Sequence, residues 1–148
     1  RFPETLEPQG IQYWRQVQKD FIERYGSDED VAHHQIAVEL GVSDRIIELI
    51  DAVGFEQIEA YYNTDDLEKK ICNYADVRVA PFGILPMHER LEEGRQRYGF
   101  HASPRWLQIK DYFEQVEDQI FSQADITPDA ITDTSCAPYR EKLQSWAI

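Results

Sequence analysis

The chain has 148 residues, of which 42% are hydrophobic and 12% aromatic, with only seven glycines and seven prolines. This composition is that of a globular domain large enough to bury a core, and it excludes a disordered or fibrous chain. Fifteen basic residues against 28 acidic ones give a formal net charge of −13. General binding to nucleic acid or to an anionic membrane surface is therefore disfavoured, because like charges repel.

The sequence also limits the compartment. The two cysteines, Cys72 and Cys136, are too few for a disulfide scaffold, although one bridge between them stays open. There is no signal-peptide pattern at the start, and no segment approaches the roughly 20 apolar residues of a membrane span. We therefore expect a soluble, cytoplasmic protein. The first residue is Arg1, not Met, which favours truncation or processing at this end.

Apolar residues recur at helical spacing almost throughout, and this periodicity predicts an all-α fold. Serine and threonine at helix starts and glycine at helix ends mark the boundaries. Capping residues are predicted at Ser27 (a capping box with Asp30), Ser43, Thr64 and Ser103, and helix-ending glycines at Gly26, Gly41, Gly54 and Gly99. The predicted helices lie at about 11–25, 28–40, 44–53, 56–62, 65–79, 87–98, 104–123 and 139–146.

The same periodicity predicts which faces are buried. The expected core positions are Ile46, Ile47, Leu49, Ile50 and Val53 in the third helix; Leu67, Ile71, Tyr74 or Ala75, and Val79 in the fifth; and Trp106, Ile109, Phe113, Val116, Ile120 and Phe121 in the seventh. Two prolines bracket the uncharged segment 80–86, which cannot be a continuous helix. No strand-like alternation, repeat or linker is evident, so we predict one all-helical domain over residues 1–148.

Common catalytic motifs are missing. The sequence has no phosphate-binding glycine loop, no nucleophile elbow, no zinc-protease motif and no paired C-x-x-C. Neither cysteine has a neighbour that would activate it as a nucleophile. Asp76 is unusual, because it lies late in a predicted helix, where a carboxylate opposes the helix dipole, and its neighbours are small or apolar. Such an acid either pairs with an arginine, the commoner case, or coordinates a cation.

The run Ile71-Cys72-Asn73-Tyr74-Ala75-Asp76-Val77-Arg78-Val79, followed by Glu89-Arg90-Leu91-Glu92-Glu93, resembles the C-terminal half of HD-domain metal-dependent phosphohydrolases. The similarity extends upstream through residues 26–29 and 36–43 and covers about 14–98, which leaves 103–148 as a helical extension. It implies a helical bundle, a divalent metal and hydrolysis of a phosphate ester, often in a nucleotide. By residue it carries over one metal ligand, Asp76.

The chain departs from this family at the metal site, where the usual downstream histidines are also replaced by Ala52-Val53-Gly54-Phe55. It has no His-Asp dipeptide, and the family's first histidine and its His-Asp pair would lie before Arg1. An additional histidine opens the next helix in dinuclear members, and His33 lies near that position, so His33 is a further metal candidate. However, His33 and His34 are about 100° apart on a helix and cannot easily chelate one ion. A solvated or capping pair is the favoured interpretation.

The local arginines are candidates for a phosphate group, since a planar guanidinium binds phosphate in a bidentate manner. Arg78 and Arg90 stay open as phosphate ligands. Arg95 and Arg97 are expected to pair with the glutamates of their own helix, which are Glu89, Glu92 and Glu93.

Two functions follow from these observations. The first is a fragment or homologue of an HD-type phosphohydrolase that acts on a small phosphorylated substrate and is inactive as this chain alone. The second is a noncatalytic helical regulatory or protein-interaction module. A ligand-type Asp76 should face a cleft without protein partners, whereas a structural one should be closed off by Arg78 or Arg90. We also expect exposed apolar surface that supports homodimerisation or dye binding.

Overall fold

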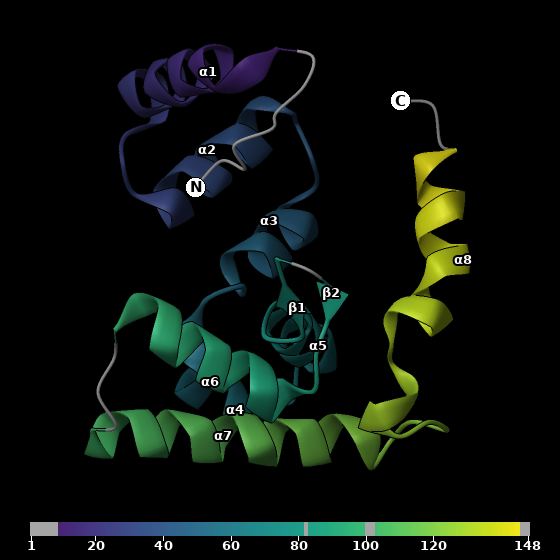
Figure 1. Ribbon diagram of the computed structural model, residues 1–148. Helices are drawn as coiled ribbons and strands as arrows, with labels where there is room; N and C mark the ends of the chain where they lie inside the picture. The colour runs from purple at the N-terminus through teal and green to yellow at the C-terminus, as the bar shows by residue number, and fades with distance from the viewer. Residues whose placement is uncertain (1–8, 82, 100–102, 146–148) are drawn as a thin grey trace. The chain divides into compact units, whose positions relative to one another are not determined.

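The structure is a computed structural model that describes residues 9–81, 83–99 and 103–145. The predicted helical class is confirmed, because eight α-helices and one two-stranded sheet make up most of the described chain (Figure 1). None of the helices in these ranges is long and apolar enough to cross a membrane.

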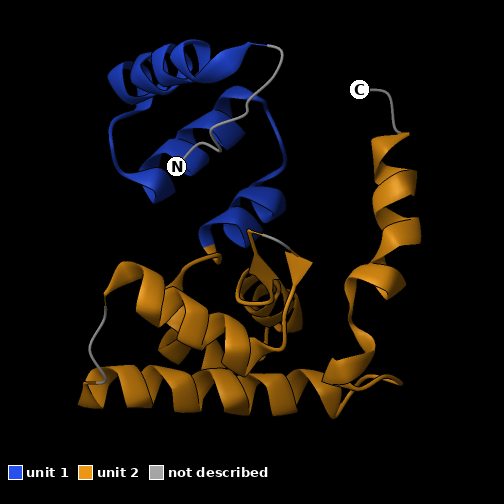
Figure 2. Cartoon of the chain, in the orientation of Figure 1, with its two compact units in different colours: residues 1–51 blue, residues 52–148 orange. Residues whose placement is uncertain are grey.

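The chain forms two compact units, residues 1–51 and residues 52–148 (Figure 2). No proline-, glycine- or serine-rich segment lies near the boundary, so the sequence shows no sign of this division. The expectation of one all-helical domain over residues 1–148 stays a prediction.

The first unit consists of three helices, α1 (Gly10–Tyr25), α2 (Glu29–Glu39) and α3 (Asp44–Asp51). Ser43 lies at the start of α3 as predicted, and its carbonyl accepts from the amides of Ile46 and Ile47. The predicted cap of α2 at Ser27 is wrong. The cap is Asp28, one residue after Ser27. Its carboxylate accepts from the free amides of Asp30 and Val31 at the start of the helix, at 3.1 Å each.

The first unit buries few side chains. Among its described residues only Ala37 is buried. The predicted core stripe of α3 is wrong, because Ile46 is exposed and the other apolar residues of this helix are only partly covered. A unit of three helices offers little surface against which a helix face can pack. The exposed apolar side chains of this unit are Tyr13, Phe21, Ile22, Val31, Val38, Leu40 and Ile46.

The second unit holds the remaining elements. They are the 3-10 turn η1 (Phe55–Gln57), α4 (Ile58–Tyr62), α5 (Leu67–Asp76), the antiparallel strands β1 (Val79–Ala80) and β2 (Gly83–Ile84), α6 (Met87–Tyr98), α7 (Pro104–Phe121), the 3-10 turn η2 (Pro128–Ala130) and α8 (Asp133–Gln144). The segment 80–86 is not a continuous helix, as predicted, and it carries a hairpin whose strands are too short to show alternation.

Helix α7 is the long helix along the lower edge of this unit in Figure 1, and α4 and α5 pack against it. Its start is fixed by Ser103, whose hydroxyl accepts from the amide of Trp106 at 3.1 Å, with Pro104 in the first turn. The predicted face of α7 is confirmed, with Phe121 partly buried. The core consists of Ile58, Tyr74, Val77, Met87, Leu91, Trp106, Ile109, Phe113, Val116 and Ile120.

The predicted buried face of α5 is confirmed at Tyr74, which is buried, and at Leu67, which packs partly buried against the core, and it is wrong at two positions. Ile71 and Val79 are exposed, while the polar residues Lys70 and Asn73 are buried beside Tyr74. The amide of Asn73 donates to the carbonyls at positions 52 and 54, at 2.9 and 2.7 Å. Two buried carbonyls therefore turn this face of the helix inward, against the apolar pattern.

Two further boundaries differ from the prediction. Asp66, not Thr64, caps α5 by accepting from the amide of Lys69 at 3.2 Å. Helix α8 begins well before Tyr139, because Thr132 and Ser135 form a reciprocal capping box in which each side chain binds the other's amide. Pro138 lies inside this helix, although proline usually breaks a helix, so the predicted start at about 139 is wrong.

Candidate functional site

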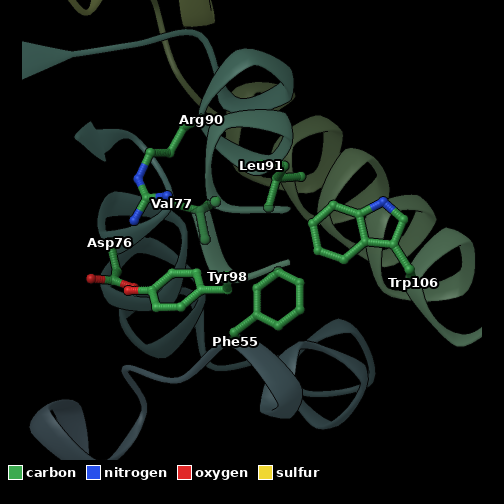
Figure 3. Close-up of a pocket in the computed structure, with 8 residues that line it drawn as sticks. Phe55, Asp76, Val77, Arg90, Leu91, Tyr98 and Trp106 are labelled. Carbon is green, nitrogen blue, oxygen red and sulfur yellow. The ribbon is translucent and has the colours of Figure 1, made fainter. Parts of the chain in front are cut away.

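A cavity of about 310 Å³ lies where the end of α5 meets α6 and the start of α7 (Figure 3). It holds two of the residues singled out in the sequence, Asp76 and Arg90. Its lining residues are Phe55, Asp76, Val77, Arg90, Leu91, Gly94, Tyr98 and Trp106.

Asp76 is the last residue of α5 and is exposed in this cavity. In the described part of the chain its carboxylate makes no hydrogen bond and no ion pair. The carbonyl end of a helix carries partial negative charge, so a carboxylate there is disfavoured unless a cation compensates it. The local structure therefore leaves an acid uncompensated at a concave surface.

Arg90 reaches the same cavity from α6. Its Nε donates to the carbonyl of Val79 at 2.6 Å and its Nη1 to Glu93 Oε2 at 3.1 Å. The side chain is 18% exposed, and its Nη2 has no acceptor among the described residues. The absence of a side chain at Gly94 leaves room for the Arg90 guanidinium, because a Cβ at Gly94 would lie 2.9 Å from Arg90 Nη1. The guanidinium is thus held in place with donors still open to a ligand.

The rest of the cavity is largely apolar. The rings of Phe55 and Trp106 stack with centroids 5.3 Å apart and an interplanar angle of 23°. Figure 3 shows the polar groups of Asp76, Arg90 and Tyr98 toward one side of the view and the Phe55 and Trp106 rings toward the other. An apolar wall lowers the local dielectric and strengthens electrostatic interactions at the polar side.

Arg78, the second predicted phosphate ligand, lies elsewhere. It is 4% exposed, and its guanidinium donates to the carbonyls of Leu85, Pro128 and Ile131 and to the hydroxyl of Tyr74. A phosphate could bind it only by displacing these bonds. The structure gives Arg78 the role of a link between α5, the loop after the hairpin and the C-terminal segment.

The hydrogen bond from Arg78 to the Tyr74 hydroxyl is the first of two linked hydrogen bonds. The hydroxyl of Tyr74 donates in turn to Glu117 Oε2 at 2.5 Å. Burial and the neighbouring carboxylate both raise the pKa of Tyr74, since each disfavours the phenolate.

His33 lies in α2 of the first unit and is exposed. Its neighbour His34 is bound to Asp51, with Nδ1 3.0 Å from both carboxylate oxygens. His33 and Asp76 thus belong to different units, and no three His, Cys, Asp or Glu side chains gather at one point within the described residues. A metal site built on both residues stays a prediction.

The remaining arginines of α6 behave as predicted. Arg95 pairs with Glu92 at 2.5 Å, and Arg97 pairs with Glu93 one turn before it. The Arg95 hydrogen bond lowers the pKa of Glu92 to about 2, with Gln96 contributing. These cations are therefore paired along their own helix.

The sequence did not reveal the aromatic residues of the cavity, Phe55, Tyr98 and Trp106, because they come from three separate segments. Gly94 could have indicated the cavity from the sequence, since glycine destabilises a helix interior and is usually found there where another group packs close to the backbone. No family model matches the chain, and no curated protein or solved structure is significantly similar to it. The HD resemblance thus rests on the sequence motifs alone.

Proposed function

We propose that this chain is a fragment or homologue of an HD-type metal-dependent phosphohydrolase in which Asp76 is one ligand of a divalent cation. The supporting observation is the exposed Asp76 carboxylate, which faces a cavity without a protein partner in the described chain. A structural aspartate would be closed off by a nearby arginine. Arg78 is instead bound to carbonyls, and Arg90 to Val79 and Glu93.

The chemistry of the cavity suits a small phosphorylated substrate. Carboxylate oxygen is the ligand type that hard divalent cations prefer. When bound, such a cation polarises a phosphoryl oxygen and makes bound water more acidic. Arg90 would orient the phosphate through its open Nη2, and the apolar wall would keep water from the opposite side.

Asp76 alone can bind a divalent cation only weakly, because stable binding needs several ligands with suitable geometry. The complete site would require ligands beyond those that the described residues bring together. We therefore propose that Asp76 and Arg90 are one side of a site, and that catalysis depends on the other side.

The test is a titration of Mn²⁺ into the ¹⁵N-labelled chain, followed by paramagnetic broadening of amide signals. We expect amides of residues 75–78 and 90–94 to broaden at lower Mn²⁺ than those beside other exposed acids, and Asp76→Asn to remove this preference. Asp118→Asn is the matched control, because Asp118 is also exposed and its carboxylate also lacks a partner in the described chain. Broadening spread evenly over the acidic surface, or unchanged in Asp76→Asn, would contradict the proposal.

A second candidate is a noncatalytic helical regulatory or protein-interaction module. The observation that favours it is the first unit, which exposes seven large apolar side chains and buries only Ala37 among its described residues. Where such side chains gather into one patch, that patch marks a contact site for another protein. In that case Asp76→Asn would leave Mn²⁺ binding unchanged, while substitutions on α1 and α2 would change self-association.

A further inference from the structure

A second cavity, of about 490 Å³, lies between the α4–α5 loop, the first turns of α5 and the C-terminal end of α7. It shares no lining residue with the cavity at Asp76. Unlike that cavity, it is mostly polar. Its lining residues are Tyr62, Asn63, Thr64, Asp65, Leu67, Lys70, Gln119, Ser122 and Gln123.

The unusual residue of this cavity is Lys70, which is 7% exposed. Its Nζ donates to Gln119 Oε1 at 2.6 Å, and this neutral amide is its one partner among the described residues. An ammonium has three donors, and burying it without a counter-ion is strongly unfavourable. A buried cation that makes no ion pair among the described residues and borders a polar cavity is therefore in position to bind an anion from solution.

Other donors surround the same space. Thr64 Oγ1 accepts from the amide of Asp66 at 3.2 Å, so its own O–H stays able to donate. Gln123 gives one N–H to the carbonyl of Gln119 at 3.1 Å and keeps a second. The carboxylate of Asp65 also lines the cavity and would repel a second negative charge on a ligand. The set of groups therefore fits a singly charged oxyanion with further hydrogen-bonding groups.

We propose that the Lys70 cavity binds the oxyanion of a small polar molecule, either a carboxylate or a phosphate monoanion. The ammonium of Lys70 binds one oxygen, and the donors of Thr64 and Gln123 bind the others. This site is independent of Asp76 and of any metal, so it holds whether or not the chain is part of a hydrolase.

Separate titrations of acetate and inorganic phosphate into the ¹⁵N-labelled chain, at constant ionic strength, test this proposal. We expect one saturable set of shifts confined to residues 62–70 and 119–123. The anion that saturates at the lower concentration identifies the ligand class. Lys70→Met should weaken binding at least about tenfold, since it removes the only cation of the cavity in the described chain.

The matched control is Lys69→Met, which removes a neighbouring charge of the same helix that does not line the cavity. Its affinity should stay within about twofold of the parent. If Lys70→Met does not fold by circular dichroism, Thr64→Val gives the same information through loss of one donor and should weaken binding. Unsaturable shifts, shifts spread over the whole chain, or unchanged binding in the folded Lys70 or Thr64 variant would overturn the proposal.

Discussion

The two units of the chain are both helical and both acidic, yet they differ in how many of their apolar side chains are buried. In the second unit, α7 supplies five buried apolar residues, and Arg78 adds a polar link to the C-terminal segment. In the first unit, seven large apolar side chains are exposed and only Ala37 is buried among the described residues. Helical periodicity therefore predicts where a helix forms, whereas burial depends on whether another element is there to receive the face.

The largest expected difference between the units is in their response to loss of an aromatic ring. Phe113 is fully buried at the centre of α7, so Phe113→Ala should cost about 3–5 kcal/mol of unfolding free energy. Phe21 of α1 is 52% exposed, and Phe21→Ala should cost less than about 1 kcal/mol. Urea denaturation measures both. Equal losses would show that the first unit has a core that the described contacts do not reveal.

A similar contrast separates the two candidate arginines. Arg78→Met should cost about 3–5 kcal/mol, because it leaves three partly buried carbonyls and the Tyr74–Glu117 pair without their donor. Arg90→Met should cost less than about 1 kcal/mol, since its ion pair with Glu93 is partly solvated. Hydrogen exchange should also show residues 128–144 losing protection in Arg78→Met alone. Retained protection there would contradict the linking role of Arg78.

These contrasts also show what could be predicted from the sequence. The bounds of α6 and the start of α7 follow from local signals, Gly99 after one helix and Ser103-Pro104 before the next. The burial of Asn73 on α5 could not be predicted, because it depends on bonds from its side chain to carbonyls about twenty residues away. The start of α8 was missed because the Thr132–Ser135 box outweighs the proline signal.

Only the residues of the candidate site that stand out within their own segment could be predicted from the sequence. Asp76 and Arg90 lie in two neighbouring segments of the chain and could be singled out by their type and position. The aromatic wall could not, since Phe55 and Trp106 come together only through tertiary packing. Arg78 was indistinguishable from Arg90 in the sequence, because only the fold decides which of the two turns inward.

The exposed apolar surface of the first unit should support self-association or dye binding at neutral pH. Leu40→Ser removes an exposed apolar residue of this unit, and Leu143→Ser removes a similarly exposed residue of α8 as a control. Sedimentation velocity and fluorescence of a hydrophobic dye should show a decrease for Leu40→Ser and little change for Leu143→Ser. A monomeric, dye-silent parent chain would argue against an interaction surface here.

The smallest expected signal is enzymatic. This chain alone should not hydrolyse a generic phosphomonoester in Mn²⁺, Mg²⁺ or Co²⁺, because one carboxylate cannot hold a catalytic cation. The measurement is phosphate release, compared between the parent chain and Asp76→Asn. Metal-dependent turnover by the parent that disappears in Asp76→Asn would show a complete site and would contradict the partial site proposed here.

The central claim is that Asp76 is a cation ligand and not a structural acid, and the unfolding free energy of Asp76→Asn tests it most directly. In chelator we expect the variant to be neutral or more stable by about 0.3–1 kcal/mol, because it removes a carboxylate from the negative end of α5. With Mn²⁺ at ten times its Kd the parent should gain about 1.4 kcal/mol and the variant clearly less. A loss of about 3–5 kcal/mol in chelator, or equal gains from Mn²⁺ in both proteins, would contradict the account.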